Sequence, residues 1–232
     1  MADGNLVRLG GIFGLVSVVA MIPAYLVGYP DAPSSPEEAG SYFEEGLGTF
    51  VFSNGVLPLF HIFFFILFLG VLYGLLRGAE EDGDDRGAGG AVRGALPAAA
   101  LGGGILFAAL EATGFTAEIL FPAALQRFGV FEPDAAFVLV SLTLSSWLYH
   151  FCQIGASAMV FVTSLVALNT GVLPTWLALA GFVVALLTFL HVLLPLVAAL
   201  VGLLWIAVVS VLMLTGGVGG ATGGPRRRTV HR

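Results

Sequence analysis

Five ionisable side chains lie within long apolar runs of the sequence, where a charged group is costly. They are His61, Glu111, Glu118, His150 and His191. At the centre of a membrane-spanning helix an Asp, Lys or Arg costs on the order of 2.5–3.5 kcal/mol, so ionisable residues there tend to mark ligand sites or proton paths. These five residues are therefore the first candidates for chemistry in this chain.

Helical spacing places several of these groups on common faces with other polar or small residues. Glu111, Gly114 and Glu118 follow an i, i+3, i+7 pattern, which puts them on one side of a helix. Asn54 and His61 are seven residues apart and share a face in the same way. We expect both faces to point toward other helices or water, because acyl chains offer no hydrogen-bond partners.

A longer polar stripe surrounds His150. Ser146, His150, Gln153 and Ser157 are spaced i, i+4, i+7, i+11, which makes a continuous polar face on one helix. We predict an internal polar site, open toward the outside, where this helix meets the two apolar helices before it. The predicted ligand-binding residues are His61, Glu111, Glu118, His150 and Gln153.

Three kinds of occupant suit these groups. A chain of Glu and His side chains can relay protons or bind a small polar or cationic ligand. His61, Glu111 and His150 can ligate a transition metal such as zinc, iron or manganese, and two His on facing helices can hold a haem iron. Alternatively, the groups only hydrogen-bond one another and hold the helices together, at about 0.6 kcal/mol per bond.

Sequence motifs do not point to an enzyme. The chain has no HExxH, GxSxG or P-loop motif. Its single cysteine, Cys152, excludes an internal disulfide and a CxxC motif and is expected to pack as a small apolar group. Without such a motif the enzyme question stays open, and the sequence favours a non-enzymatic role.

The elements that must position these residues are membrane-spanning helices. The 232-residue chain is 58% hydrophobic and only 10% charged, and its mean hydropathy is +0.98. Soluble domains carry about 25% charged residues, so this chain has too few charges to cover a globule facing water. We predict an all-α, polytopic membrane protein.

Six apolar stretches approach or exceed the roughly 20 residues that a helix needs to cross a bilayer. The predicted spans are Leu9–Val27, Asn54–Leu76, Ala95–Phe121, Ala136–Leu168, Val172–Leu190 and Leu196–Leu214. We place a tight hairpin between the last two, where Pro195 interrupts the helical pattern. The first stretch is longer than the apolar part of a signal peptide, so we expect it to be retained.

The positions of the arginines predict the orientation of the bundle. With six spans and a cytoplasmic N-terminus, eight of the nine basic residues lie inside and only Arg127 lies outside. Both termini are therefore expected to be cytoplasmic. Residues 1–215 form the transmembrane domain, and residues 216–232 are expected to be a flexible Gly- and Arg-rich tail.

The first outer loop, Gly28–Ser53, is acidic and has no basic residue. Within it, Ser35 and Glu38 form a capping-box pattern around Pro36, which predicts a short helix starting at Pro36. We interpret the loop as an ordered connector rather than a binding lid.

The turn between the fourth and fifth spans resembles a known family. Gly171, Leu173, Pro174, Trp176 and Leu177 match a Gly-x-Leu-Pro-x-Trp-Leu turn that recurs in small bacterial six-helix membrane proteins of unknown function. The Arg8-x-Gly10-Gly11 start is also similar, whereas Thr175 stands where those proteins usually carry a basic residue. The resemblance implies a six-helix fold and assigns no site.

These observations lead to one functional expectation and two alternatives. We expect a protein of a prokaryotic plasma membrane with an outward-facing polar site for a small ligand or ion, used in transport or binding. The first alternative is a metal- or haem-binding membrane protein or enzyme, and the second is an accessory subunit of a membrane complex. The bilayer is the expected partner, a homo-oligomer or a complex is compatible with the pattern, and three consecutive tail arginines are too few to predict nucleic-acid binding.

Overall fold

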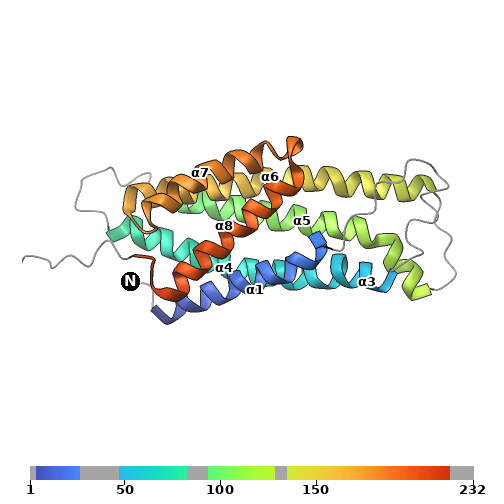
Figure 1. Cartoon of the computed structure of the whole chain (residues 1–232), viewed down its shortest axis with the longest axis horizontal. Coiled ribbons are helices and arrows are strands. Elements are labelled where there is room, and N and C mark those ends of the chain that lie inside the picture. The colour runs from blue at the N-terminus through green and yellow to red at the C-terminus, as the bar shows by residue number, and fades with distance from the viewer. Residues whose placement is uncertain (1–3, 27–46, 83–93, 129–134, 220–232) are drawn as a thin grey trace, which may run out of the picture.

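The computed structural model of the chain describes residues 4–26, 47–82, 94–128 and 135–219, and the regular secondary structure within them is helical (Figure 1). The α-helices are α1 (Gly4–Leu26), α3 (Leu47–Val51), α4 (Leu57–Asp82), α5 (Ala95–Phe128), α6 (Ala135–Thr170), α7 (Thr175–Phe189) and α8 (Pro195–Thr215). A π-helical segment, Phe52–Val56, joins α3 to α4, and a 3-10 turn, His191–Leu193, joins α7 to α8.

Five of these helical segments are long and apolar enough to cross a membrane, which makes the chain a polytopic membrane protein. They are α1, the continuous α3–α4 segment, α5, α6 and α8. The sixth predicted span is α7, which has 15 residues and is therefore about 22 Å long at 1.5 Å per residue. The predicted bundle of six main helices is present among the described residues, although one helix is shorter than a bilayer is thick.

The six helices form a closed ring. Each packs against the next in the order α1, α4, α5, α6, α7, α8, and α8 closes the ring against α1. Residues carried by all six helices can therefore face a common interior.

The six-helix ring is shorter than the longest helices of the molecule. We call the end where α1 begins and α8 ends the terminal end, and the opposite end the distal end (Figure 1). α5 and α6 have 34 and 36 residues, so each is about 50 Å long, whereas α1 with 23 residues is about 35 Å long. Of the described helices, only α3 with its π-helical segment, α5 and α6 reach the distal end, where Phe50, Phe121 and Val138 form a small separate core.

Glycines allow two of these contacts to be unusually close. A Cβ on Gly103 would lie 2.8 Å from the Gly155 carbonyl oxygen, and one on Gly155 would lie 2.6 Å from the Phe107 amide nitrogen. The backbones of α5 and α6 therefore touch, as small residues permit in membrane helices. A Cβ on Gly14 would likewise meet Ser210 of α8, so α1 also lies close to its neighbour.

The helix that carries His61 begins earlier than Asn54, where the sequence predicted its start. Helical structure runs from Leu47, and its π-helical part buries Ser53, Asn54 and Gly55. Pro58 has no N–H to donate to the carbonyl of Asn54, and the π-helical turn lies where that α-helical bond is missing. The polar residues Ser53 and Asn54 are thus part of the bundle rather than of a loop.

The helix that carries Glu111 also continues past its predicted end at Phe121. Pro122 lies inside α5, which ends at Phe128. An interior proline costs about 3 kcal/mol, and here Phe121 and Leu125 pack with Phe50 and Val138 in the distal core. We attribute the continuation of the helix to this packing.

The two turns predicted in the C-terminal part of the sequence, before and after α7, are present. Gly171 ends α6 with a positive φ of 73°, and Pro174 precedes α7. Pro195 occupies the first turn of α8, so the α7–α8 hairpin lies where the sequence placed it.

The helix predicted from Pro36 and most of the predicted tail lie outside the described residues. Six of the nine arginines also lie outside them, so the orientation of the bundle stays a prediction.

Candidate intramembrane polar site

The main polar feature of the ring is a hydrogen-bonded pair formed by His61 of α4 and Glu111 of α5. His61 Nε2 and Glu111 Oε2 are 3.0 Å apart. The two residues are 0% and 6% exposed. Burying a polar group without a hydrogen-bond partner costs several kcal/mol. The contact between His61 and Glu111 avoids this cost for both groups.

The second ring nitrogen of His61 faces α1. Nδ1 lies 3.0 Å from the Ser17 carbonyl oxygen and 3.0 Å from Ser17 Oγ. Because a carbonyl oxygen can only accept, the first contact is a hydrogen bond only when Nδ1 carries a proton. The backbone of α1 therefore favours a His61 ring protonated at Nδ1.

This constraint leaves one proton to be shared between His61 and Glu111. If Nε2 is also protonated, the pair is an imidazolium donating to a carboxylate. If it is not, Glu111 is a neutral acid donating to Nε2. The two forms differ only in the position of one proton along a 3.0 Å contact, so the pair as a whole can be electrically neutral in either form.

Apolar contacts hold this pair at a defined depth. The His61 ring stacks on Phe65 and meets the edge of Phe107, with centroids 6.0 and 6.4 Å away. Its partner Ser17 lies 13 residues after the start of α1, about 20 Å from the terminal end. The pair therefore lies within the length of α1, in its distal half, and not in the distal extension.

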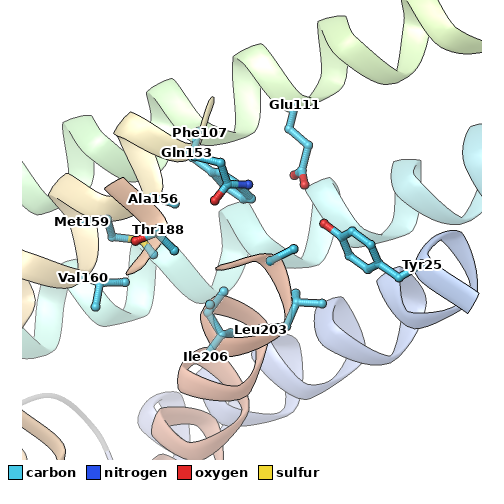
Figure 2. A pocket seen from close by; sticks show the side chains of 12 residues that line it. Tyr25, Phe107, Glu111, Gln153, Ala156, Met159, Val160, Thr188, Leu203 and Ile206 are labelled. Atoms are coloured by element: carbon cyan, nitrogen blue, oxygen red, sulfur yellow. The ribbon is translucent and has the colours of Figure 1, made fainter. Parts of the chain in front are cut away.

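Glu111 also borders a small cavity in the centre of the ring. The cavity has a volume of about 30 Å³, and its lining includes Tyr25, Glu111, Gln153 and Thr188 together with apolar residues of α5, α6 and α8. Figure 2 shows the Tyr25 hydroxyl pointing toward the Glu111 carboxylate. A cavity needs a volume of about 10–15 Å³ and two or more polar partners to hold one water molecule. This cavity is therefore large enough for one or two water molecules.

A second histidine pair lies between α6 and the α7–α8 hairpin. His150 Nδ1 and His191 Nε2 are 2.8 Å apart, and His191 Nδ1 lies 2.9 Å from the Thr188 carbonyl oxygen. His191 is 3% exposed, whereas His150 is half-buried. Trp147 and Tyr149 contact the pair with their rings.

The same reasoning about acceptors fixes the protons of this pair. The Thr188 carbonyl requires a proton on His191 Nδ1, so a neutral His191 presents a lone pair at Nε2. His150 must then donate from Nδ1, which leaves its own Nε2 as an acceptor when the ring is neutral. The half-buried outer imidazole is thus the member of the pair that is free to accept a proton.

The structure divides the predicted set of residues into two pairs. It joins His61 to Glu111 and places Gln153 beside the same cavity, but it pairs His150 with His191. Glu118 is 2% exposed on the same face of α5 as Glu111, seven residues and about 10 Å further toward the distal end. That these residues bind a ligand remains a prediction.

The geometry does not assemble the expected metal site. Among the described residues no three His, Cys, Asp or Glu side chains lie close enough together to hold one metal ion. His61, Glu111 and His150 therefore do not form a single ligand set, and the cavity of about 30 Å³ beside Glu111 has no room for a haem. The predicted polar stripe of α6 is also shorter than expected, because Ser146 is exposed and Ser145 is buried in its place.

The sequence did not predict three residues that contact the histidines or line the cavity. Ser17 and Tyr25 come from α1 and Thr188 from α7, whereas the site was expected among the second, third and fourth spans. Ser17 is 0% exposed, and a hydroxyl in the middle of an apolar span was the available signal. Which helices close the ring cannot be inferred from their individual patterns.

Comparison of the chain with protein-family models, with curated protein sequences and with solved structures finds no match in any of the three. The resemblance at the Gly171–Trp176 turn therefore stays an expectation, and the case for function rests on the geometry alone.

Proposed function

We propose that this membrane protein binds a small cation, either a proton or a monovalent ion of similar size, at the His61–Glu111 pair. The observation that carries the proposal is the position of Glu111, which hydrogen-bonds His61 and at the same time borders the central cavity. A carboxylate so placed has one side fixed by the protein and is adjacent to space that can hold water. Ionisable groups with this placement in membranes commonly belong to ion or proton paths.

The size of the cavity limits which ligands can bind beside Glu111. Sites for organic ligands usually have volumes of about 300–1,000 Å³, whereas this cavity has about 30 Å³. In the arrangement described here, only water or a small ion fits beside Glu111. The proposal therefore replaces the broader expectation of a small polar ligand with that of a small cation.

The proposal also includes the side on which the site exchanges with water. Both the His61–Glu111 pair and the His150–His191 pair lie toward the distal end of α1 and of the hairpin. The arginine bias predicts that the distal side is extracytoplasmic, so the site would face outward. A reporter fused to the C-terminus checks this orientation: we expect activity only from a reporter that functions in the cytoplasm, and activity from one that requires an oxidising compartment would reverse it.

Infrared difference spectroscopy of the full chain in liposomes tests the binding site. Stepping the external pH, or exchanging Na⁺ for a bulky cation at constant pH, should change the carboxyl bands of Glu111. The Glu111→Gln variant should lose at least nine-tenths of one of these signals while remaining folded, because the substitution removes little volume. Glu81→Gln is the matched control, since Glu81 is exposed and bonds Arg77 at the surface of α4, and it should keep the signal.

If neither pH nor Na⁺ changes a band that depends on Glu111, the His61–Glu111 pair only holds α4 and α5 together. The same conclusion follows if Glu81→Gln removes as much of the signal as Glu111→Gln.

A further inference from the structure

We infer that the cation is a proton and that the His150–His191 pair carries it between the distal side and the central cavity. This inference rests on the proposed function of the His61–Glu111 pair and adds the identity of its ligand and its route. The pair of imidazoles is otherwise unexplained, because a single hydrogen bond between hairpin and helix does not need two titratable rings.

The two imidazoles extend the walls of the cavity by one helical turn. Gln153 of α6 and Thr188 of α7 line the cavity. His150 precedes Gln153 by three residues, and His191 follows Thr188 by three. Because α6 runs from the distal end and α7 runs toward it, both histidines lie about 5 Å beyond the cavity on the distal side.

Two hydrogen bonds connect Thr188, which lines the cavity, to the half-buried His150. Thr188 borders the cavity, and its carbonyl accepts a hydrogen bond from His191 Nδ1 at 2.9 Å. His191 Nε2 in turn accepts from His150 Nδ1 at 2.8 Å. His191 is buried and His150 is half-buried, so His150 is the ring nearer the surface of the bundle, and the proposal requires that this part of the surface contact water.

Imidazole is the side chain best suited to this task, since it can gain a proton on one nitrogen and lose one from the other near neutral pH. A proton from the distal solution adds to His150 Nε2, and the Nδ1 proton of His150 moves to His191 Nε2. The Nδ1–H of His191 must then leave the Thr188 carbonyl before it can give its proton to water in the cavity, and that water gives a proton to the His61–Glu111 pair. One proton has left the solution and one has been added to the pair, and both rings are neutral again with their protons on the opposite nitrogens until they rotate or the transfer reverses.

The other titratable groups near the rings do not interrupt this path. Tyr149 contacts both rings, but its hydroxyl donates to the Pro195 carbonyl at the start of α8. Cys152 donates to the Tyr149 carbonyl and is buried. Across the cavity the titratable groups are Glu111 and Tyr25, and Glu111 is the proposed recipient.

After a rapid jump in external pH, the infrared band of Glu111 in the full chain can be recorded over time. Its rate of change reports proton transfer to Glu111, and its final amplitude reports how much proton is bound. His150→Ala should slow the appearance of the protonated band at least tenfold, and its final amplitude should stay close to that of the unaltered protein. Free imidazole added to the buffer should restore much of the rate, because it can occupy the half-buried position of the missing ring. His191→Gln should be slowed as strongly, but imidazole should restore little, since that position is buried.

Tyr149→Phe is the matched control for a merely structural role. It removes the hydroxyl that ties α6 to the hairpin and keeps both imidazoles, so its rate should stay within about twofold of the unaltered protein. The inference is overturned if His150→Ala protonates Glu111 at the normal rate, if imidazole fails to restore a slowed rate, or if Tyr149→Phe is equally slow. A Glu111 band that responds to Na⁺ and not to pH also overturns it and leaves the proposed cation site intact, whereas the absence of any Glu111 response overturns the proposed function itself.

Discussion

The two histidine pairs of this protein use the same side chain in opposite ways. His61 has both ring nitrogens occupied, one by the Glu111 carboxylate and one by Ser17 of α1, and it is fully buried among three helices. His150 has one nitrogen occupied by His191 and is half-buried. The first pair is neutral when it holds one shared proton, because a carboxylate balances the imidazolium, whereas the second pair is neutral without such a proton and becomes charged when it takes one up. Under the proposed function, the first pair would store a proton and the second would transfer it.

Removing one member of each pair should lower the free energy of unfolding by different amounts. We expect the larger loss at the buried His61–Glu111 pair. His61→Leu leaves the Glu111 carboxylate buried without its partner, and breaking a buried charge pair in this way costs about 3–5 kcal/mol. His191→Leu leaves His150, which can turn toward water, so we expect a loss of only about 1 kcal/mol. Unfolding of both variants in the same detergent gives the two values, and equal losses would remove the distinction between the pairs.

Sequence reasoning found the participants in these pairs but not their pairing. The cost of ionisable groups in lipid identified His61, Glu111, His150 and His191, and helical spacing correctly put Glu111, Gly114 and Glu118 on one buried face. The partner of His150 depends on where the α7–α8 hairpin meets α6, and that contact depends on the order of helices around the ring. A periodic pattern shows which face of a helix is buried and not which neighbour covers it.

The predicted boundaries of several helices were wrong for a related reason. Pro122 and the polar Ser53–Asn54 sequence look like ends of spans, yet both lie inside continuous helical segments because the distal core holds them there. Conversely, α7 was expected to run from Val172 to Leu190 and has only 15 residues, Thr175–Phe189. The number and order of the helices were predictable from hydropathy, but the three-helix extension at the distal end was not.

A second prediction separates the structural role of the buried pair from its proposed chemistry. Replacing both members, His61→Leu with Glu111→Leu, removes the desolvated groups together, and such replacements of buried ion pairs are often neutral or stabilising. We expect the double variant to recover about 2–4 kcal/mol of the loss caused by His61→Leu alone. It should nevertheless give no carboxyl band that responds to pH. A double variant as unstable as His61→Leu would show that Glu111 is not the source of the cost.

A third prediction concerns the hydrogen bond between His150 and His191. A double-mutant cycle with His150→Gln and His191→Gln measures the coupling energy of this contact. Hydrogen bonds between membrane helices average about 0.6 kcal/mol, with a maximum near 1.7 kcal/mol. A value in this range supports a weak, exchangeable contact. A coupling well above this range would mean that the pair clamps the hairpin and would argue against its release of protons to the cavity.

The smallest expected effect lies at Ser17 and tests the protonation of His61 directly. Both the carbonyl oxygen and Oγ of Ser17 are 3.0 Å from His61 Nδ1, so the Ser17→Ala variant removes one of the two and keeps the other. If Nδ1 carries the proton, the carbonyl still accepts it, and we expect the free energy of unfolding to fall by no more than about 0.5 kcal/mol, less than an average hydrogen bond contributes. The pH response of the Glu111 band should also be unchanged. If instead the hydroxyl donates to an unprotonated Nδ1, the ring is protonated only at Nε2 and Glu111 is permanently the acceptor. Ser17→Ala would then cost about 1–3 kcal/mol, because a buried nitrogen loses its donor, and the response of the Glu111 band to pH would change. Ser210→Ala, which removes another buried helix hydroxyl that donates to the Ile206 carbonyl of its own helix, sets the baseline against which the Ser17 result is compared.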